Sequence, residues 1–473
     1  MVRDKKHLSA KGTSNHLGLY LLLSSAFFHF MLFSILLPPW QGHDEPMHLE
    51  YIELIRQGYV PSSTMFRTEQ WWKHIPENVI QSIEERIVGS MKLFRFWTIN
   101  EIPVSPEAND FSAIYRGATA LRQAPLYYML NALLLSLFNI QSLLVSLYVV
   151  RFVSIMFWLG TIYMIYQMSR AYFGEDNPLV YGAPFAVMIL PMPALMAGVA
   201  NNDALAVFIS SAALAFMATA LRRGPRKIDV LLLFACTFFA LLSKRTTITL
   251  LALIPIFCVL SYLSEKGILI FIRSFMISGV VILLLILIIL SPLWQLLGIS
   301  HWADQPERSL FVKSFFSWQH QDTFFHYFYT SFWGCFVWGH HFLPDYIYST
   351  FLIINSMLVM SLLWSGVRIS SPLREENLIK CRQLILFVCA IMTQFLLIYI
   401  RFFAQVPLWN LAQGRFILGV IGPIMILFTV GLEQLVPPPF RRSVLILCGV
   451  SLLLFDLYVQ LCHIWPHYYM FYY

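Results

Sequence analysis

The chain has 473 residues, of which 58% are hydrophobic and only 12% are charged, and its mean hydropathy is +0.67. A water-soluble protein of this length could not bury so much apolar surface, so the composition excludes a soluble enzyme or binding module. The net charge of +7 is modest, and basic residues cluster in short loops, as membrane orientation requires. We therefore expect an all-α, polytopic helical membrane protein with no nucleic-acid partner.

Apolar runs of about 20 residues match the thickness of a bilayer's hydrocarbon core and predict about eleven spans in one membrane domain, residues 1–473. No small-residue cleavage site follows the first run, which we interpret as a retained span and not as a signal peptide. Basic residues at 222–227, 368–382 and 441–442 place the amino terminus in the cytoplasm and the carboxyl terminus outside. The predicted spans are 17–37, 143–169, 179–199, 203–221, 228–243, 246–263, 274–297, 347–367, 384–403, 415–435 and 443–462.

Two long segments, 38–142 and 298–346, fall outside the membrane in this arrangement, and loops of such length are usually functional. The first closes with an amphipathic stretch, 124–138, that is too short to cross comfortably. We interpret it as a helix that lies on the membrane; if 124–141 crosses instead, every later orientation reverses. A disulfide between Cys335 and Cys462 is a minor alternative to seven unpaired cysteines.

An acidic motif directly follows the first span. The apolar run stops at Pro38, and the residues from Gln41 to His48 include Asp44 and Glu45. Carboxylates at the edge of the membrane can hold a divalent cation or take a proton from a substrate that docks from the bilayer. A helix that starts at Pro46 would place Asp44 and His48 on one face. For the motif alone, capping of that helix is an equally strong interpretation.

Cations stand at the outer ends of later spans, where they are expensive unless they have partners. Lys244 and Arg245 end one span, and Arg415 begins another directly after Gly414, which leaves room for close approach. A phosphate would account for these charges, because arginine can bind phosphate with two parallel hydrogen bonds. Snorkelling or a structural ion pair is the alternative. Arg151 lies deeper in a span and suggests a buried pair with an acid of the first loop.

Other polar or aromatic groups have structural alternatives of comparable weight. Tyr127 can anchor a helix at the interface, the triplet that contains Asn202 and Asp203 can cap one, and Trp333 can belong to an aromatic lid. Their functional interpretation is sugar or lipid binding.

The ordered set of motifs resembles the GT-C superfamily of membrane glycosyltransferases that use polyprenyl-phosphate sugars, and most closely an uncharacterised group of bacterial predicted membrane proteins. The resemblance spans nearly the whole chain. It departs where many relatives have proline before the Pro-Leu-Tyr-Tyr element and this chain has Gln123-Ala124, which leaves the acceptor open. The motifs are Asp44-Glu45-Pro46 with His48, Asn201-Asn202-Asp203, Ser331-Phe332-Trp333-Gly334 and Gln413-Gly414-Arg415-Phe416.

The resemblance implies an inverting transfer from a polyprenyl-phosphate-linked sugar to a glycan, lipid or protein acceptor, at the non-cytoplasmic face of the bacterial inner membrane. Asp44 or Glu45 would act as general base or would bind a divalent cation, Mg or Mn. Arg415 and Lys244 would stabilise the leaving lipid phosphate. The implied substrate-binding residues are His48, Tyr127, Asn202, Asp203, Lys244, Arg245, Trp333 and Arg415.

Three other functions stay open. A transporter or flippase of lipid-linked sugars would use the same cations, but it should place polar residues near the middle of the bilayer, often on broken helices. A polymerase or ligase would use lipid-pyrophosphate glycans. A non-catalytic assembly subunit would tolerate the loss of both acids.

Overall fold

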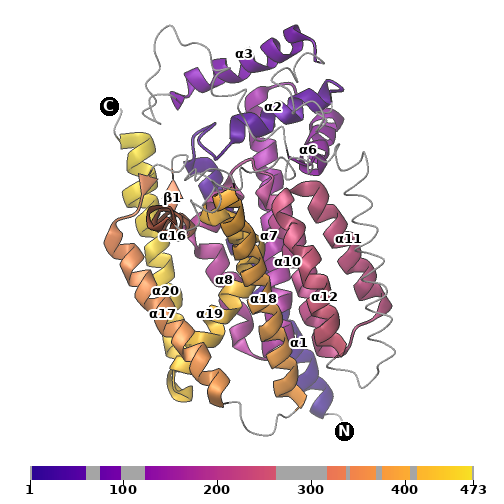
Figure 1. Ribbon diagram of the computed structural model, residues 1–473, viewed down its shortest axis with the longest axis vertical. Helices are drawn as coiled ribbons and strands as arrows, with labels where there is room; N and C mark the ends of the chain where they lie inside the picture. The colour runs from indigo at the N-terminus through magenta and orange to yellow at the C-terminus, as the bar shows by residue number, and fades with distance from the viewer. Residues whose placement is uncertain are drawn as a thin grey trace.

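Long helices run side by side through the molecule, and the two chain termini lie at its opposite ends (Figure 1). The computed structural model describes residues 3–59, 75–96, 123–262, 317–336, 341–368, 375–404 and 413–470. Within these ranges all regular structure is helical except one two-stranded hairpin. A helix satisfies its backbone hydrogen bonds internally, as the bilayer interior requires. The long helices are α1 (Arg3–Leu36), α7 (Leu143–Phe173), α10 (Asp203–Arg223), α17 (Asp345–Arg368), α18 (Glu375–Ala404), α19 (Ile421–Leu435) and α20 (Arg441–Val459).

Seven stretches of the described chain are long and apolar enough to cross a membrane. Their large apolar side chains remain exposed on α17 and α20, as lipid-facing surfaces require. These findings confirm the prediction of an all-α polytopic membrane protein. The spans are Leu17–Leu36, Leu143–Phe173, Asp203–Arg223, Asp345–Leu362, Glu376–Phe403, Gly414–Leu435 and Pro438–Met470.

The span predicted at 179–199 is not one straight helix but a bent pair of helices. The short helix η4 (Pro178–Tyr181) and α8 (Gly182–Ile189) end before Leu190, and α9 (Pro191–Gly198) leaves at an angle of 63°. Proline disfavours a helical conformation in the preceding residue and cannot donate a backbone hydrogen bond, so the chain bends at Pro191. If this bent pair counts as one span, the number of candidate spans rises to eight.

The predicted spans at 228–243 and 246–263 correspond to α11 (Lys227–Ser243) and to η5 (Arg245–Ile248) followed by α12 (Thr249–Tyr262). They are helical but shorter than the seven spans above. The predicted span 274–297 lies outside the described residues, so the count of eleven stays a prediction.

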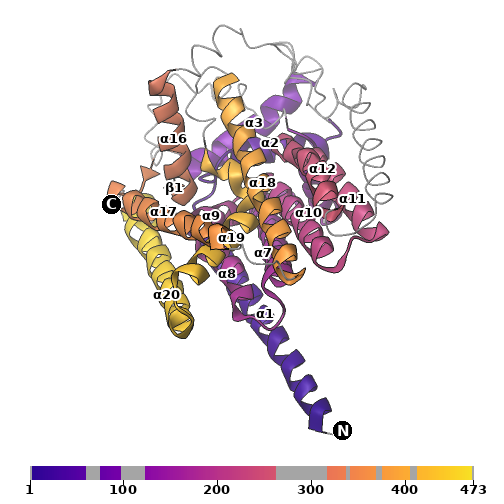
Figure 2. The same ribbon diagram turned by 60° about the horizontal axis from the view of Figure 1, so that its bottom comes forward.

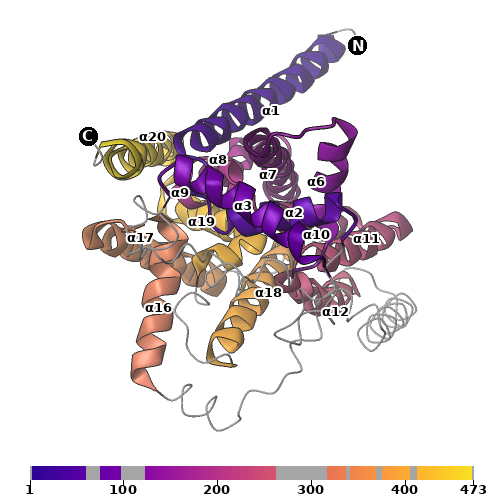
Figure 3. The same ribbon diagram turned by 90° about the horizontal axis from the view of Figure 1, so that it is seen from above.

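Three helices of the first long loop cover one end of the bundle (Figure 3). They are α2 (Glu45–Arg56), α3 (Glu77–Leu93) and α6 (Leu126–Leu137). With 12 residues, α6 is about 18 Å long at 1.5 Å per residue, too short to cross a core of about 30 Å. It exposes Leu133 and Leu137 and matches the short helix expected within 124–138, whose position on the membrane stays a prediction. At the other end of the bundle, the first turns of α1 extend beyond the neighbouring helices (Figure 2).

The second long loop contributes α16 (Trp318–Trp333) and the hairpin of β1 (Cys335–Phe336) and β2 (His341–Phe342). The helix packs on η9 (Gly414–Val420), the turn that carries Arg415. Gly414 donates its backbone N–H to Ser331 Oγ at 2.7 Å. A Cβ at this glycine would meet Phe332 N at 2.3 Å, so only glycine permits this approach. The motifs around Ser331 and Gly414 are therefore parts of one contact.

All seven cysteines are free thiols, Cys335 buried and Cys462 exposed, so the minor alternative of a disulfide between them is not observed.

Replacement of Gly414 by alanine should force α16 away from η9, because the new methyl group overlaps backbone atoms that cannot move alone. Such overpacking costs about 1–3 kcal/mol. We expect a lower Tm for purified Gly414→Ala in detergent. Gly449→Ala on α20 is the control, since its Cβ would meet nothing closer than 3.5 Å. Equal Tm values for the two variants would contradict the contact.

Candidate functional site

The acidic motif forms a tight turn between α1 and α2. Asp44 occupies the N-cap position of α2 without a side-chain capping bond, and its φ of 61° lies in the left-handed region, where aspartate is more readily tolerated than most residues. The helix begins at Glu45, one residue earlier than predicted, and His48 N–H bonds to the Asp44 carbonyl at 3.0 Å. This local conformation sends the two neighbouring carboxylates to different partners.

Glu45 is completely buried and paired with Arg151 of α7. Arg151 donates to the two carboxylate oxygens through Nε and Nη2, each at 2.7 Å. The same carboxylate accepts from Gly42 N at 3.0 Å and Ala200 N at 2.9 Å. The predicted pair between Arg151 and an acid of the first loop is confirmed.

Arg151 uses its remaining hydrogens on the end of the first span. It donates to the carbonyls of Ser34 and Leu37 at 2.8 Å and of Pro38 at 3.0 Å. All five guanidinium donors and about four carboxylate lone pairs are thus occupied. Glu45 therefore has no acceptor position left for a metal ion or a substrate proton.

Asp44 faces the opposite way and bonds to Arg415, with Oδ2 and Nη2 2.9 Å apart. Its side chain keeps 28% of its surface exposed, whereas that of Arg415 keeps 8%. Arg415 Nε and Nη1 are buried and have no hydrogen-bond partner in the described structure. Burial raises the pKa of Asp44, but the charge and hydrogen bond of Arg415, together with the charges of His48 and His43, outweigh it and lower the pKa of this carboxyl to about 2. The site therefore presents an ionised acid beside an arginine with unused donors.

His48 lies beneath Asp44 on a stack of tyrosines. Its Nδ1 is 2.9 Å from Tyr128 OH, and Tyr51 stacks on Tyr128 with ring centroids 4.0 Å apart. Burial lowers the pKa of His48 to about 4, so this imidazole is neutral at ordinary pH. Tyr127 is also buried and bonds to Ser154 Oγ at 3.1 Å. The rings of Tyr51, Tyr127 and Tyr128 thus pack with His48 in one buried aromatic cluster.

The polar triplet before α10 supplies a second ion pair. Lys244 Nζ bonds to Asp203 Oδ1, and both side chains are buried. Asn201 Oδ1 accepts from the N–H of Asp203, the first residue of α10, at 2.6 Å, whereas Asn202 at the N-cap position makes no side-chain capping bond. Asn202 Nδ2 is 3.5 Å from the Ser243 carbonyl, at the limit of a hydrogen bond. Among the described residues, Asp203 Oδ2 has no hydrogen-bond partner although it is buried.

The two ion pairs meet at Phe416, the residue after Arg415. Lys244 Nζ lies 5.5 Å and Arg415 Cζ 5.4 Å from the centre of its ring. Arg401 Cζ lies 5.3 Å from the same centre. Arg401 is absent from the candidate residues predicted from sequence, because it stands inside a predicted span. Arg401 could have been found by the feature that identified Lys244, a cation at the end of an apolar run.

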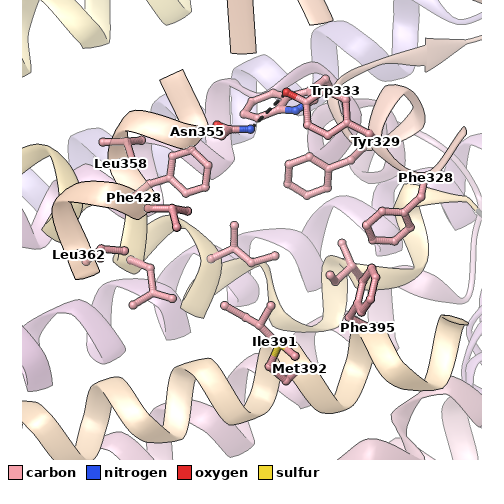
Figure 4. Close-up of a pocket in the computed structure, with 15 residues that line it drawn as sticks. Phe328, Tyr329, Trp333, Asn355, Leu358, Leu362, Ile391, Met392, Phe395 and Phe428 are labelled. Atoms are coloured by element: carbon pink, nitrogen blue, oxygen red, sulfur yellow. Dashed lines mark hydrogen bonds between the residues drawn. The ribbon is translucent and has the colours of Figure 1, made fainter. Parts of the chain in front are cut away.

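An apolar groove adjoins this cluster and opens between α16, α17, α18 and α19 (Figure 4). It encloses about 490 Å³. Val359 and Met392 on its rim are more than half exposed, so the groove opens on the surface that faces lipid. Ile417 and Phe332 line it next to Arg415 and Gly414. Trp333 stacks on Phe351 with centroids 3.9 Å apart and belongs to this groove, not to the polar cluster.

The structure thus brings together Asp44, His48, Asp203, Lys244 and Arg415. Glu45 and Tyr127 lie behind them, and Arg245, which makes interactions of its own, stands beside Lys244. In the described part of the chain no group of three or more histidine, cysteine or carboxylate side chains could hold a metal ion. With Glu45 saturated and Asp44 bound to Arg415, these two acids do not fit the divalent-cation site suggested from sequence.

Comparison of the chain with solved structures finds distant likenesses. ArnT from Cupriavidus metallidurans bound to undecaprenyl phosphate gives a TM-score of 0.48 at 16% identity, over 95% of this chain and 73% of that one. Its apo state gives 0.47 at 15% identity, over 96% and 74%. The Archaeoglobus fulgidus oligosaccharyltransferase tethered to an acceptor peptide gives 0.46 at 13% identity, over 95% and 54%.

No curated protein sequence matches the chain. A family model does: the family described as Predicted membrane protein (DUF2142) matches residues 27–426. This match covers both motifs that form the ion pair of Asp44 and Arg415 and confirms the resemblance to a group of predicted membrane proteins. The chain belongs to the DUF2142 family of predicted membrane proteins.

Proposed function

We propose that this protein is an inverting glycosyltransferase that moves a sugar from a polyprenyl-phosphate donor to an acceptor hydroxyl at the non-cytoplasmic face of the membrane. The observation that carries the proposal is the pair of Asp44 and Arg415: an ionised carboxylate, partly exposed, next to an arginine with two unpaired nitrogens. An acid that takes a proton and a cation that receives a phosphate are the two groups that such a transfer requires.

The donor's phosphate would bind Arg415 through its unpaired Nε and Nη1, with Lys244 as the second cation. Buried polar atoms without partners are costly, so an anion at this position would satisfy them. The polyprenyl chain would lie in the groove beside Ile417 and Trp333, which opens toward the lipid. A charged head group and an apolar chain thus have adjacent sites of matching chemistry.

In the proposed step the acceptor oxygen attacks the anomeric carbon while the bond from that carbon to the phosphate oxygen breaks. The proton of the acceptor hydroxyl passes to Asp44, and the electron pair of the broken bond remains on the lipid phosphate, beside Arg415 and Lys244. General-base help of this kind is worth about 10²–10⁴ in rate. Glu45 does not take part; it fixes the turn that presents Asp44. The step uses no metal ion.

Donor binding would also prepare the base. A carboxyl with a pKa of about 2 is a weak base, because the Arg415 charge stabilises its ionised form. A donor phosphate on Nε and Nη1 of Arg415 would offset part of the positive charge that stabilises the Asp44 carboxylate, so the pKa of Asp44 would rise, in the same direction as burial acts. Asp44 then becomes a stronger base only once the sugar is in place.

The face of the membrane follows from the distribution of basic residues. Helix α10 starts at Asp203 in the site and ends at Arg222 and Arg223. Arg170 lies in the last turn of α7, and α20 begins at Arg441 near the same end of the bundle (Figure 1). Basic residues favour the cytoplasmic side, so we infer that the site opens on the other side.

Transport of lipid-linked sugars is the second candidate function, and two observations favour it. The bent pair of α8 and α9 is a broken helix, as many transporters have near their substrate. Asp456 of α20 also pairs with His29 of α1 at 2.9 Å, inside two candidate spans. Ionisable residues in such positions often mark a substrate or proton path.

Asp44→Asn should lower transfer from a radiolabelled polyprenyl-phosphate sugar by at least about 10²-fold, because the amide cannot accept the acceptor's proton. The assay uses purified protein in nanodiscs, with Glu376→Gln as control, an exposed acid that pairs with Lys380. Wild-type transfer by Asp44→Asn would remove this residue from catalysis. Wild-type translocation of the lipid-linked sugar by the variant, with no transfer by either protein, would favour transport.

Glu45→Gln should act on folding. Removal of one partner of a buried ion pair costs about 3–5 kcal/mol, because the other charge stays buried without compensation. We expect a clear fall in Tm and in the yield of folded protein, larger than for Asp44→Asn. Glu433→Gln, in a partly exposed pair with Arg441, should cost no more than about 1 kcal/mol. A stable Glu45→Gln variant that lacks transfer would instead make Glu45 a catalytic residue.

The acid limbs of the pH profiles should differ. The limb of kcat/KM reports the free enzyme, and the limb of kcat reports the donor complex. Because Arg415 lowers the pKa of Asp44 in the free protein to about 2, Asp44 stays ionised there down to low pH. Loss of this stabilisation raises the pKa in the complex, so the limb of kcat should lie at higher pH than that of kcat/KM. Acid limbs at the same pH would contradict a rise in the pKa of Asp44 on donor binding.

A further inference from the structure

Arg401 occupies the last turn of α18, and its guanidinium lies beside the ring that Lys244 and Arg415 also approach. The backbone of Phe416, which carries this ring, is held by a hydrogen bond from α18. Gln394 of α18 donates to the Phe416 carbonyl at 2.8 Å and accepts from Thr249 Oγ1 at 2.6 Å. The charged groups of Lys244, Arg401 and Arg415 are each within 5.5 Å of the ring centre. Any two of them are therefore separated by no more than twice this distance.

The charges of this cluster do not balance among the described residues. Lys244 has Asp203 as its partner, and Arg415 has Asp44. Arg401 makes no ion pair of its own in the described part of the chain: Asp203, the carboxylate that attracts it, is paired with Lys244, and Arg401 contacts the face of an aromatic ring. A cation–π contact contributes roughly 0.5–2 kcal/mol and does not neutralise the charge. An unbalanced cation at the end of a candidate span is expensive, which indicates an anionic ligand.

We propose that Arg401 is a third phosphate-binding residue, and that it gives the site the charge that a lipid monophosphate requires. This inference rests on the function proposed above. Three cations and two carboxylates leave one net positive charge, which a singly charged phosphodiester donor cancels. After transfer, Asp44 holds a proton and the cluster has two net positive charges. The released phosphate monoester carries about −1.5 to −2 and again cancels them.

This balance favours a monophosphate over a diphosphate. A leaving lipid diphosphate carries more negative charge than the cluster can neutralise, and uncompensated charge at a poorly hydrated site is costly. Arg401 therefore determines the class of donor. Without it, Lys244 and Arg415 would be balanced by Asp203 and Asp44 and would leave no net positive charge for the phosphate.

The test is the binding of a radiolabelled polyprenyl phosphate and of the corresponding diphosphate to the full-length protein in detergent. We expect the wild type to prefer the monophosphate. Arg401→Gln should weaken monophosphate binding roughly 10- to 100-fold, as expected for loss of one charge-assisted hydrogen bond, and Arg401→Lys only a few-fold. Arg223→Gln is the control and should bind normally, because Arg223 pairs with Asp229 of α11 and lies at the end of α10 opposite Asp203.

Phe416→Leu separates the two roles of Arg401. It removes the cation–π contact and keeps the charge, so its effect should be smaller than that of Arg401→Gln. If Arg401→Gln does not fold, Arg401→His provides the test. The ratio of its affinity to that of the wild type should be higher at pH 5 than at pH 8, because protonation of the histidine restores the cation. Unchanged binding by Arg401→Gln, a pH-independent Arg401→His or a wild-type preference for diphosphate would overturn the inference. Failure of the wild type to bind either lipid would instead overturn the proposed function.

Discussion

The buried pair of Arg151 and Glu45 organises the end of the molecule at which the candidate site lies. One guanidinium holds the last carbonyls of the first span and the first acid of α2, and that acid holds the backbone at Ala200 before α10. Three segments far apart in the sequence are thus joined by charge-assisted hydrogen bonds with every donor and acceptor used. A fully satisfied network of this kind fixes geometry, even though desolvation offsets most of its gain in stability.

Because Glu45 is fixed in this way, its neighbour Asp44 is presented on the other side of the turn. The left-handed backbone at Asp44 makes this possible, and Arg415 completes the arrangement from the far end of the chain. Two adjacent acids therefore have separate parts: the buried one supports the fold, and the partly exposed one faces the cations around Phe416. The polar end of the lipid-facing groove is built on this division.

Hydropathy was enough to predict the class of fold and the position of most spans, because spacing of apolar residues is a local property of the chain. It did not predict the bend at Pro191, since the composition on both sides of the break is equally apolar. The sequence also could not separate Asp44 from Glu45, which differ in backbone conformation and partner and not in chemistry. Arg401 was missed because one cation barely alters the hydropathy of a span, and its proximity to Lys244 exists only in three dimensions.

The backbone contact between Gly414 and α16 has a consequence for how such chains can diverge. The turn that carries Arg415 touches Phe332 with no side chain between them, and Ser331 binds the same turn. A larger residue at position 414 can be accommodated only if α16 also shifts, which would reshape the groove at Phe332 and Trp333. Residues that shape the apolar groove and residues that position Arg415 are thus subject to one steric constraint. Substitutions at these two positions should therefore appear together in homologous proteins.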